Sequence, residues 1–257
     1  MIIDTNIRRV QTLDDRRNLI FPGDYEETIV YCANHFIDLC QKNISKKTYF
    51  SVALSGGSTP KSIFQMLSSD QFKNEIEWDK ILFFWSDERA VPPEDSESNY
   101  KMAMDSGIKN MPIKQENIFR MKAEHNIEKN AKEYEELINK KLHSQLFDLV
   151  MLGVGDDGHT ASLFPNTEAL KETEKLVAAN YVPQKNTWRM TLTFKAINQS
   201  KNIVLYILGG NKKTILKKIL FPEPGSKSYP SQMIGSSQNK ALWIVDKAAA
   251  ADLKNLT

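Results

Sequence analysis

The sequence has little cysteine, no long apolar run and almost no excess of charge. Cys32 and Cys40 are its only two cysteines, and on one helix they would lie about 12 Å apart along the axis, too far for a disulfide. No apolar run approaches the roughly 18 residues that cross a bilayer. Basic residues number 34 and acidic residues 32, a net charge of +2, so bulk charge attracts no polyanion such as DNA. We therefore expect a soluble, cytoplasmic, reduced protein that binds neither a membrane nor a nucleic acid.

What is present is the composition of a globular protein, with 41% apolar and 26% charged residues among 257. Residues 1–18 are polar and carry acids, so we do not expect a secretory signal or a transit peptide. The stretch 221–235 is rich in proline, glycine and serine, but strand and helix patterns resume beyond it, which indicates a loop or lid. We therefore expect a single domain over residues 1–257.

Apolar strands alternate with amphipathic helices along the chain. Short apolar runs predict strands at 49–54, 81–85, 147–152, 176–181, 190–194, 203–208 and 242–245. Helical spacing predicts helices at 26–41, from about Pro60 onward, at 98–106, 128–142 and 211–220, and a short one at the C-terminus. This alternation favours a Rossmann-like α/β fold, a mainly parallel sheet with helices on both faces. Ligands of such sheets bind beyond the carboxyl ends of the strands, so residues that follow strands are the candidates for a site.

The first candidate segment follows the strand at 49–54. It consists of Ser55, Gly56, Gly57, Ser58 and Thr59. Glycines allow close approach of the backbone to a ligand, and the next helix presents unpaired N–H groups and a partial positive charge. This chemistry suits a phosphate, although no glycine precedes Lys61 as the nucleotide-triphosphate loop requires. The alternative is a plain turn in which serine or threonine caps the helix.

The second candidate segment is Ser86-Asp87-Glu88-Arg89, directly after the strand at 81–85. Three adjacent charges at the end of a buried strand are costly unless they are paired or used. The planar, five-donor guanidinium of Arg89 suits oxyanions better than a lysine does. The alternative is a helix cap with a surface ion pair.

The third candidate segment, 153–160, reads Gly-Val-Gly-Asp-Asp-Gly-His-Thr and formally matches the dinucleotide fingerprint after a strand. We reject that reading because Asp156 and Asp157 would place two carboxylates where a pyrophosphate must sit. Pro165 also follows too soon for a long helix to start there. A turn that holds Asp157 two residues before His159 suits an aimed imidazole instead, and histidine is the commonest general base. A lone histidine is usually structural, but the glycine-rich turn favours a catalytic role here.

The fourth candidate is a pair of basic residues, Arg189 and Lys212, each next to a predicted strand end. Together they would clamp a phosphate. The neighbouring lysines at 213, 217 and 218 fit a solvated helix face better.

With these residues assembled, the sequence resembles the 6-phosphogluconolactonase family, within the wider group that includes glucosamine-6-phosphate deaminases. The resemblance runs from residue 55 through the strand that contains Trp243. Its most specific element is Gly153-x-Gly-x-Asp157-Gly-His159-Thr-Ala-Ser-Leu-Phe164-Pro165. Ser86-Asp-Glu-Arg89-x-Val91-Pro92, Ser98-Asn99-Tyr100 and the Gly209–Lys212 segment add to it.

The resemblance implies hydrolysis of 6-phosphoglucono-1,5-lactone to 6-phosphogluconate, in the oxidative branch of the pentose phosphate pathway, without a metal or an organic cofactor. It implies that His159 is the general base, with Asp157 beside it, and that Arg89 contacts oxygens of the substrate. Segment 55–59 would hold the phosphate together with Arg189 and Lys212. Asp87 would orient Arg89 or His159, or only cap a helix.

Two other functions stay open at this point. Glucosamine-6-phosphate deaminases carry a glutamate that works with the histidine in ring opening, and Phe164 stands at the matching position here. A phenyl ring accepts no proton, which favours lactone hydrolysis. A non-catalytic sugar-phosphate sensor would keep the pocket, but such proteins commonly carry a DNA-binding appendage and no recognition-helix motif stands out. The oligomeric state is left open by the sequence.

Overall fold

The computed structural model describes residues 9–143 and 146–253. Part of the polar N-terminal segment and residues 254–257 of the expected C-terminal helix lie outside the described residues. The described part of that C-terminal segment contradicts the helix, because residues 247–252 form turns. The buried carboxylate of Asp246 accepts from the backbone N–H groups of Ala249 at 2.7 Å and Gly209 at 3.0 Å. A single helical turn follows, in which the Ala250 N–H donates to the Asp246 carbonyl at 3.0 Å, and the next bond, from the Leu253 N–H to the Ala250 carbonyl at 2.8 Å, closes a tighter turn instead of continuing a helix.

A mixed, mainly parallel sheet forms the centre of the molecule. Within the described residues it has seven strands in the order β1-β2-β10-β9-β6-β3-β4, of which only β1 runs antiparallel to its neighbour. The strands are β1 (Gln11–Thr12), β2 (Arg17–Ile20), β3 (Phe50–Leu54), β4 (Ile81–Trp85), β6 (Leu149–Leu152), β9 (Ile203–Ile207) and β10 (Ala241–Val245). The expected parallel sheet is confirmed. Strands β1 and β2 were not predicted, because they are only two and four residues long and contain few apolar residues.

Helices lie between the strands, close to the ranges that the periodicity predicts. They are α1 (Tyr25–Ile44), α2 (Ser58–Leu67), α3 (Asn99–Asp105), α4 (Ile127–Leu142), α5 (Phe194–Asn198) and α6 (Lys213–Leu220). Short 3-10 turns occur at Lys73–Glu75, Trp78–Lys80, Ile108–Asn110, Gln115–Asn117, Glu168–Lys171, Pro183–Lys185, Gly210–Lys212 and Pro230–Met233. No helix in the described part of the chain has both the length and the apolarity that a membrane crossing requires.

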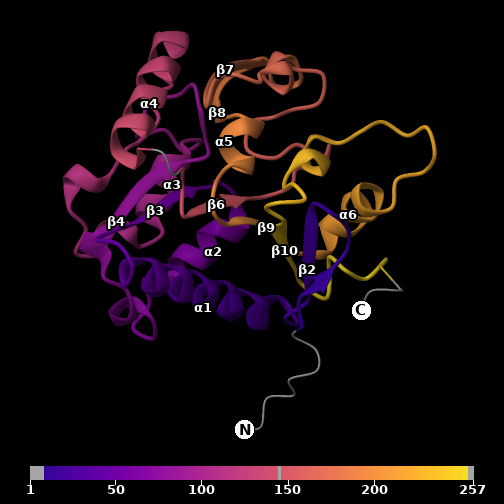
Figure 1. Cartoon of the computed structure of the whole chain (residues 1–257), viewed down its shortest axis with the longest axis horizontal. Coiled ribbons are helices and arrows are strands. Elements are labelled where there is room, and N and C mark those ends of the chain that lie inside the picture. Colours follow the sequence, from indigo (N-terminus) through magenta and orange to yellow (C-terminus); the bar gives the residue numbers. More distant parts are fainter. Residues whose placement is uncertain (1–8, 144–145, 254–257) are drawn as a thin grey trace, which may run out of the picture.

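The helices cover both faces of the sheet. Phe36 of α1 packs edge-on against Phe50 of β3, with ring centroids 5.5 Å apart. Phe84 of β4 packs against Tyr134 of α4, with centroids 6.2 Å apart. Since Phe84 pairs with Ala53 and successive residues of a strand point to opposite faces, Phe50 and Phe84 lie on opposite sides of the sheet. Helices α1 and α4 therefore cover opposite faces (Figure 1).

A second, antiparallel sheet stands apart from the main one. In the described structure it has three strands in the order β5-β8-β7, namely β5 (Asp87–Arg89), β8 (Thr187–Leu192) and β7 (Val177–Val182). Strands β7 and β8 form a hairpin at the top of Figure 1, joined by a tight turn that ends at Asn186 with a positive φ of 46°. So short a connection leaves no room for a crossover helix, and the pairing is antiparallel for that reason. The strands predicted at 176–181 and 190–194 therefore belong to this separate layer and not to the parallel sheet.

The topology brings distant segments to one edge of the main sheet. Strands β9, β6 and β3 are neighbours and run parallel. The segments that follow them, 55–59, 153–159 and 209–212, therefore meet at the carboxyl edge. The chain leaves β3 toward β4 and leaves β6 toward β9, so this edge contains a topological switch point, where open α/β sheets bind ligands.

Candidate active site

A cavity of about 260 Å³ opens at this carboxyl edge. Ten of the eleven site residues predicted from the sequence line it: Ser55, Gly56, Gly57, Ser58, Thr59, Asp87, Arg89, His159, Arg189 and Lys212. The eleventh, Asp157, is not part of the lining among the described residues but contacts His159. The structure thus brings the four candidate segments to one place.

The imidazole of His159 is held by Asp157. The Nδ1 atom of His159 lies 2.5 Å from Oδ1 of Asp157, and the same oxygen accepts from the His159 backbone N–H at 3.1 Å. Burial by itself would raise the pKa of Asp157, but the hydrogen bonds from His159 outweigh it, and the pKa lies below its usual value. An ionised carboxylate only accepts, so the neutral imidazole carries its proton on Nδ1 and keeps Nε2 as the basic nitrogen.

Two glycines shape the turn that carries this histidine. A Cβ atom on Gly155 would lie 2.0 Å from Nδ1 of His159, so only glycine allows the ring to fold back over the turn. Gly158 has a φ of +77°, and its N–H donates to the Gly155 carbonyl at 2.9 Å. The glycine-rich pattern that resembles a dinucleotide loop therefore serves to place an imidazole.

Phe164 covers one face of the imidazole. Its ring and that of His159 are stacked, with centroids 3.9 Å apart and planes at 18°. Phe164 also lines the cavity. The group next to the base is therefore apolar and has no proton to exchange.

Arg89 and Arg189 form a pair of guanidinium groups at the cavity. The two residues are directly opposite each other in the antiparallel pairing of β5 and β8. Nη1 of Arg89 donates to the backbone carbonyl of Glu97, while the buried Nε atoms of both arginines have no hydrogen-bond partner among the described residues. Burial lowers the pKa of Arg189, and the neighbouring charge of Arg89 lowers it further. Two partly buried cations that line one cavity suit a ligand that carries negative charge.

The glycine segment after β3 opens directly into α2. The residue that precedes the helix is Gly57, with a φ of +103°, and in the described structure no side chain caps the first turn. The alternative in which serine or threonine caps this helix is therefore wrong. Backbone N–H groups of the first turn stay available, as at many anion sites.

Lys212 reaches the cavity from the end of the turn Gly210–Lys212. Its Nζ lies 2.6 Å from Oδ1 of Asp156, which is an exposed side chain. Lys212 thus has a carboxylate partner that an anionic ligand would compete with.

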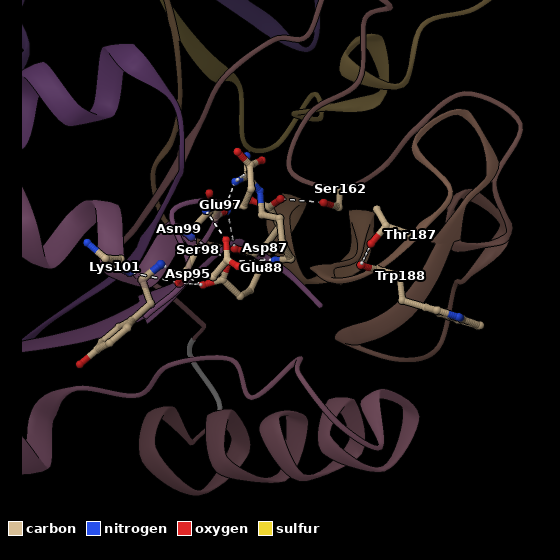
Figure 2. Close-up of polar contacts among 12 residues, drawn as sticks. Asp87, Glu88, Asp95, Glu97, Ser98, Asn99, Lys101, Ser162, Thr187 and Trp188 are labelled. Carbon is tan, nitrogen blue, oxygen red and sulfur yellow. Dashed lines mark hydrogen bonds and ion pairs between the residues drawn. The ribbon is translucent and has the colours of Figure 1, made fainter. Parts of the chain in front are cut away.

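Asp87 is buried and has partners that the sequence analysis did not predict. Its Oδ2 accepts from Ser162 Oγ at 2.6 Å, and its Oδ1 accepts from Asn99 Nδ2 at 3.2 Å (Figure 2). Among the described contacts, its carboxylate makes no hydrogen bond to Arg89 or His159 and caps no helix. Asn99, Ser162 and Tyr206 also line the cavity and were missed as site residues. Two motifs of the sequence contain residues of this set, since Asn99 belongs to Ser98-Asn99-Tyr100 and Ser162 to the segment 153–165.

The fold and the cavity define an α/β protein with a histidine and three cationic side chains at the switch point of its sheet. A sequence model described as "Glucosamine-6-phosphate isomerases/6-phosphogluconolactonase" matches residues 23–243. The chain belongs to this family.

Similar proteins agree with this assignment. The chain is 42% identical over 233 residues to the 6-phosphogluconolactonase of Chlamydia pneumoniae, covering 86% of this chain and 89% of that one. It is 38% identical over 247 residues to that of Chlamydia trachomatis, covering 95% and 94%. Among solved structures, the 6-phosphogluconolactonase from Trypanosoma cruzi superposes with a TM-score of 0.81 at 27% identity, covering 97% of this chain and 100% of that one.

Proposed function

We propose that this protein hydrolyses 6-phosphoglucono-1,5-lactone to 6-phosphogluconate, with His159 as the general base. The observation that carries the proposal is the Asp157-oriented imidazole in a cavity that Arg89, Arg189 and Lys212 also line. The names of the relatives support the same reaction. A lactone is an activated ester, so a base, a cation for the developing oxyanion and a grip on the distant phosphate are sufficient.

In the proposed first step, Nε2 of His159 takes a proton from a water molecule as the water oxygen bonds to the lactone carbonyl carbon. The carbonyl oxygen becomes an oxyanion, which Arg89 stabilises by a charge-assisted hydrogen bond. Asp157 keeps the imidazole oriented and stabilises the imidazolium that forms. Base catalysis of this kind contributes about 10²–10⁴-fold.

In the second step the tetrahedral intermediate collapses. The bond between the carbonyl carbon and the ring oxygen breaks, and the ring oxygen takes the proton from the His159 imidazolium. The products are the neutral base and the open-chain acid, which ionises at neutral pH and releases one proton. That released proton is the signal by which the reaction is measured.

We assign the phosphate of the substrate to the part of the cavity that Arg189 and Lys212 line. Arg189, Lys212 and the uncapped first turn of α2 supply cationic and N–H donors there. Binding of the phosphate holds the lactone over the base and favours phosphorylated over free sugars. This requires that the phosphate displace or share the contact between Lys212 and Asp156.

The stacked ring of Phe164 weighs against a glucosamine-6-phosphate deaminase. That reaction uses a carboxylate beside the histidine, and the position on the imidazole face belongs here to a phenyl ring. The test is proton release from freshly generated 6-phosphogluconolactone, corrected for spontaneous hydrolysis, beside ammonia release from glucosamine 6-phosphate. We expect signal in the first assay. Signal in the second assay alone would overturn the proposal.

A further inference from the structure

Glu88 is a buried carboxylate that the proposed mechanism does not use. It lies between Asp87 and Arg89 on β5, and only 3% of the residue is exposed. Because side chains alternate along a strand, the Glu88 side chain points away from its two cavity-lining neighbours. Burial raises the pKa of Glu88, although hydrogen bonds from three backbone N–H groups act in the opposite direction. A carboxylate buried at this cost has a specific task.

The carboxylate of Glu88 accepts four hydrogen bonds (Figure 2). Its Oε1 accepts from the backbone N–H groups of Arg89 and Asn99, both at 2.8 Å. Its Oε2 accepts from the Tyr100 backbone N–H at 2.9 Å and from Ser98 Oγ at 3.0 Å. Three of these donors belong to the first turn of α3 or its N-cap, so Glu88 fixes α3 to β5 as a remote helix cap.

This attachment positions groups that line the cavity. The backbone N–H of Asn99 donates to Glu88, and the Asn99 side chain is thereby placed beside Asp87. Its Nδ2 donates to the backbone carbonyl of Asp87 at 2.9 Å and to the Asp87 carboxylate at 3.2 Å. Asn99 also packs tightly against the glycine segment, since a Cβ atom on Gly56 would lie only 1.9 Å from Oδ1 of Asn99. The carbonyl that accepts from Arg89 belongs to Glu97, just before the segment that Glu88 holds.

We propose that Glu88 is a positioning residue for the active site, which acts by fixing the α3 N-terminus so that Arg89, Asp87 and the glycine segment keep one geometry. The proposal rests on the proposed function for its kinetic readout, but not for its binding readout. Misplacement of reacting groups by about 1 Å costs on the order of 100-fold in rate. A merely structural carboxylate would change the stability of the protein and leave the kinetics of the folded protein unaltered.

The test variant is Glu88→Gln, which keeps shape and volume but replaces one oxygen by an amide. Oε1 accepts from two backbone N–H groups and Oε2 from one, so in either orientation the amide N–H₂ faces a donor and at least one backbone N–H loses its acceptor. We expect kcat/KM to fall about 10- to 100-fold and inorganic phosphate to bind more weakly in calorimetric titration.

The matched control is Asp148→Asn. Asp148 is fully buried, accepts from the Ser51 backbone N–H at 2.9 Å and Oγ at 3.0 Å, and pairs with Lys47 at 2.7 Å. It precedes β6, at the sheet edge opposite the cavity, so its variant should lose stability and keep wild-type kinetics and phosphate affinity.

Ser98→Ala and Ser106→Ala are a second pair of variants, at the two ends of α3, that remove less of the structure. They replace the first pair if Glu88→Gln does not fold. Of these, only Ser98 contacts Glu88, and only its variant should lower kcat/KM.

The outcomes separate the two proposals. If the wild type hydrolyses the lactone and kcat/KM and phosphate affinity fall no further in Glu88→Gln than in Asp148→Asn, the positioning role is overturned and the proposed function stands. A wild type that binds phosphate but does not hydrolyse the lactone overturns the proposed function. In that case the loss of phosphate affinity in Glu88→Gln alone still supports the positioning role. A wild type that does neither overturns both.

Discussion

Arg89 and Arg189 stand directly opposite each other on antiparallel strands, at the wall of one cavity. Like charges in directly opposed positions destabilise a sheet, and burial lowers the pKa of Arg189 in the same direction as its neighbour does. Neighbouring carboxylates offset part of this cost, since the charges of Asp87, Glu97 and Glu88 raise the pKa of Arg189. The repulsion that remains favours a ligand that carries negative charge, which is the proposed anion site.

The first prediction concerns this anion site. Arg189→Ala should raise KM for the lactone about 10- to 100-fold with little change in kcat, because a lost charge-assisted hydrogen bond costs about 1.5–3 kcal/mol. Lys212→Ala should act in the same direction, and Lys217→Ala, on the helix that follows, serves as the control. Steady-state kinetics separate the two parameters. A loss of kcat alone in both variants would contradict a role in phosphate binding.

The second prediction concerns the exposed pair of Lys212 and Asp156. Asp156→Asn frees Lys212 for the ligand and should lower KM, with kcat unchanged. Exposed ion pairs are worth at most about 1 kcal/mol, so the change should not exceed about fivefold. An unchanged or higher KM in this variant would show that Asp156 does not compete with the phosphate.

The third prediction concerns the base. His159→Ala should lower kcat about 10²–10⁴-fold and leave the affinity for 6-phosphogluconate nearly intact, because the imidazole acts on water and not on the phosphate. His125→Ala is the control, since His125 is exposed and outside the cavity lining. Rapid assays of proton release give kcat, and calorimetric titration with 6-phosphogluconate gives the affinity for the product. Turnover within a few-fold of the wild type would remove His159 from the proposed mechanism.

Much of this site could be predicted from the sequence because its segments follow apolar strands. The run at 81–85 coincides with β4, Ile81–Trp85, and parallel strands end at a common edge, so residues after β3, β6 and β9 had to meet there. The Asp157–His159 contact is local and follows from a two-residue spacing in a glycine turn.

The contacts that depend on pairing between distant strands could not be predicted in the same way. Nothing in the local pattern around Arg89 indicates that β5 pairs with β8, or that Arg189 is its direct neighbour. The partners of Asp87 come from Ser162 and Asn99, which the sequence separates from it and the small sheet brings together. The bond from the Gly209 N–H to the buried Asp246 carboxylate likewise joins segments that lie far apart in the sequence.

The fourth prediction concerns a histidine away from the cavity. Burial in α1 lowers the pKa of His35 from 6.5 to about 4, and its Nδ1 has no hydrogen-bond partner among the described residues. The folded protein therefore holds His35 neutral at a pH where the unfolded chain already binds a proton. The contribution of His35 to the free energy of unfolding should be fully present above pH 6.5. It should decrease as the pH falls from 6.5 to about 4, because in this range the unfolded chain binds a proton that the folded protein does not.

The variant that tests this is His35→Phe, which keeps an aromatic ring against Tyr31, with which His35 is stacked at 6.2 Å, and removes the titration. Denaturant unfolding at several pH values should give a shallower pH dependence for this variant than for the wild type. Parallel curves for the two proteins would mean that His35 does not contribute to the acid sensitivity of the fold.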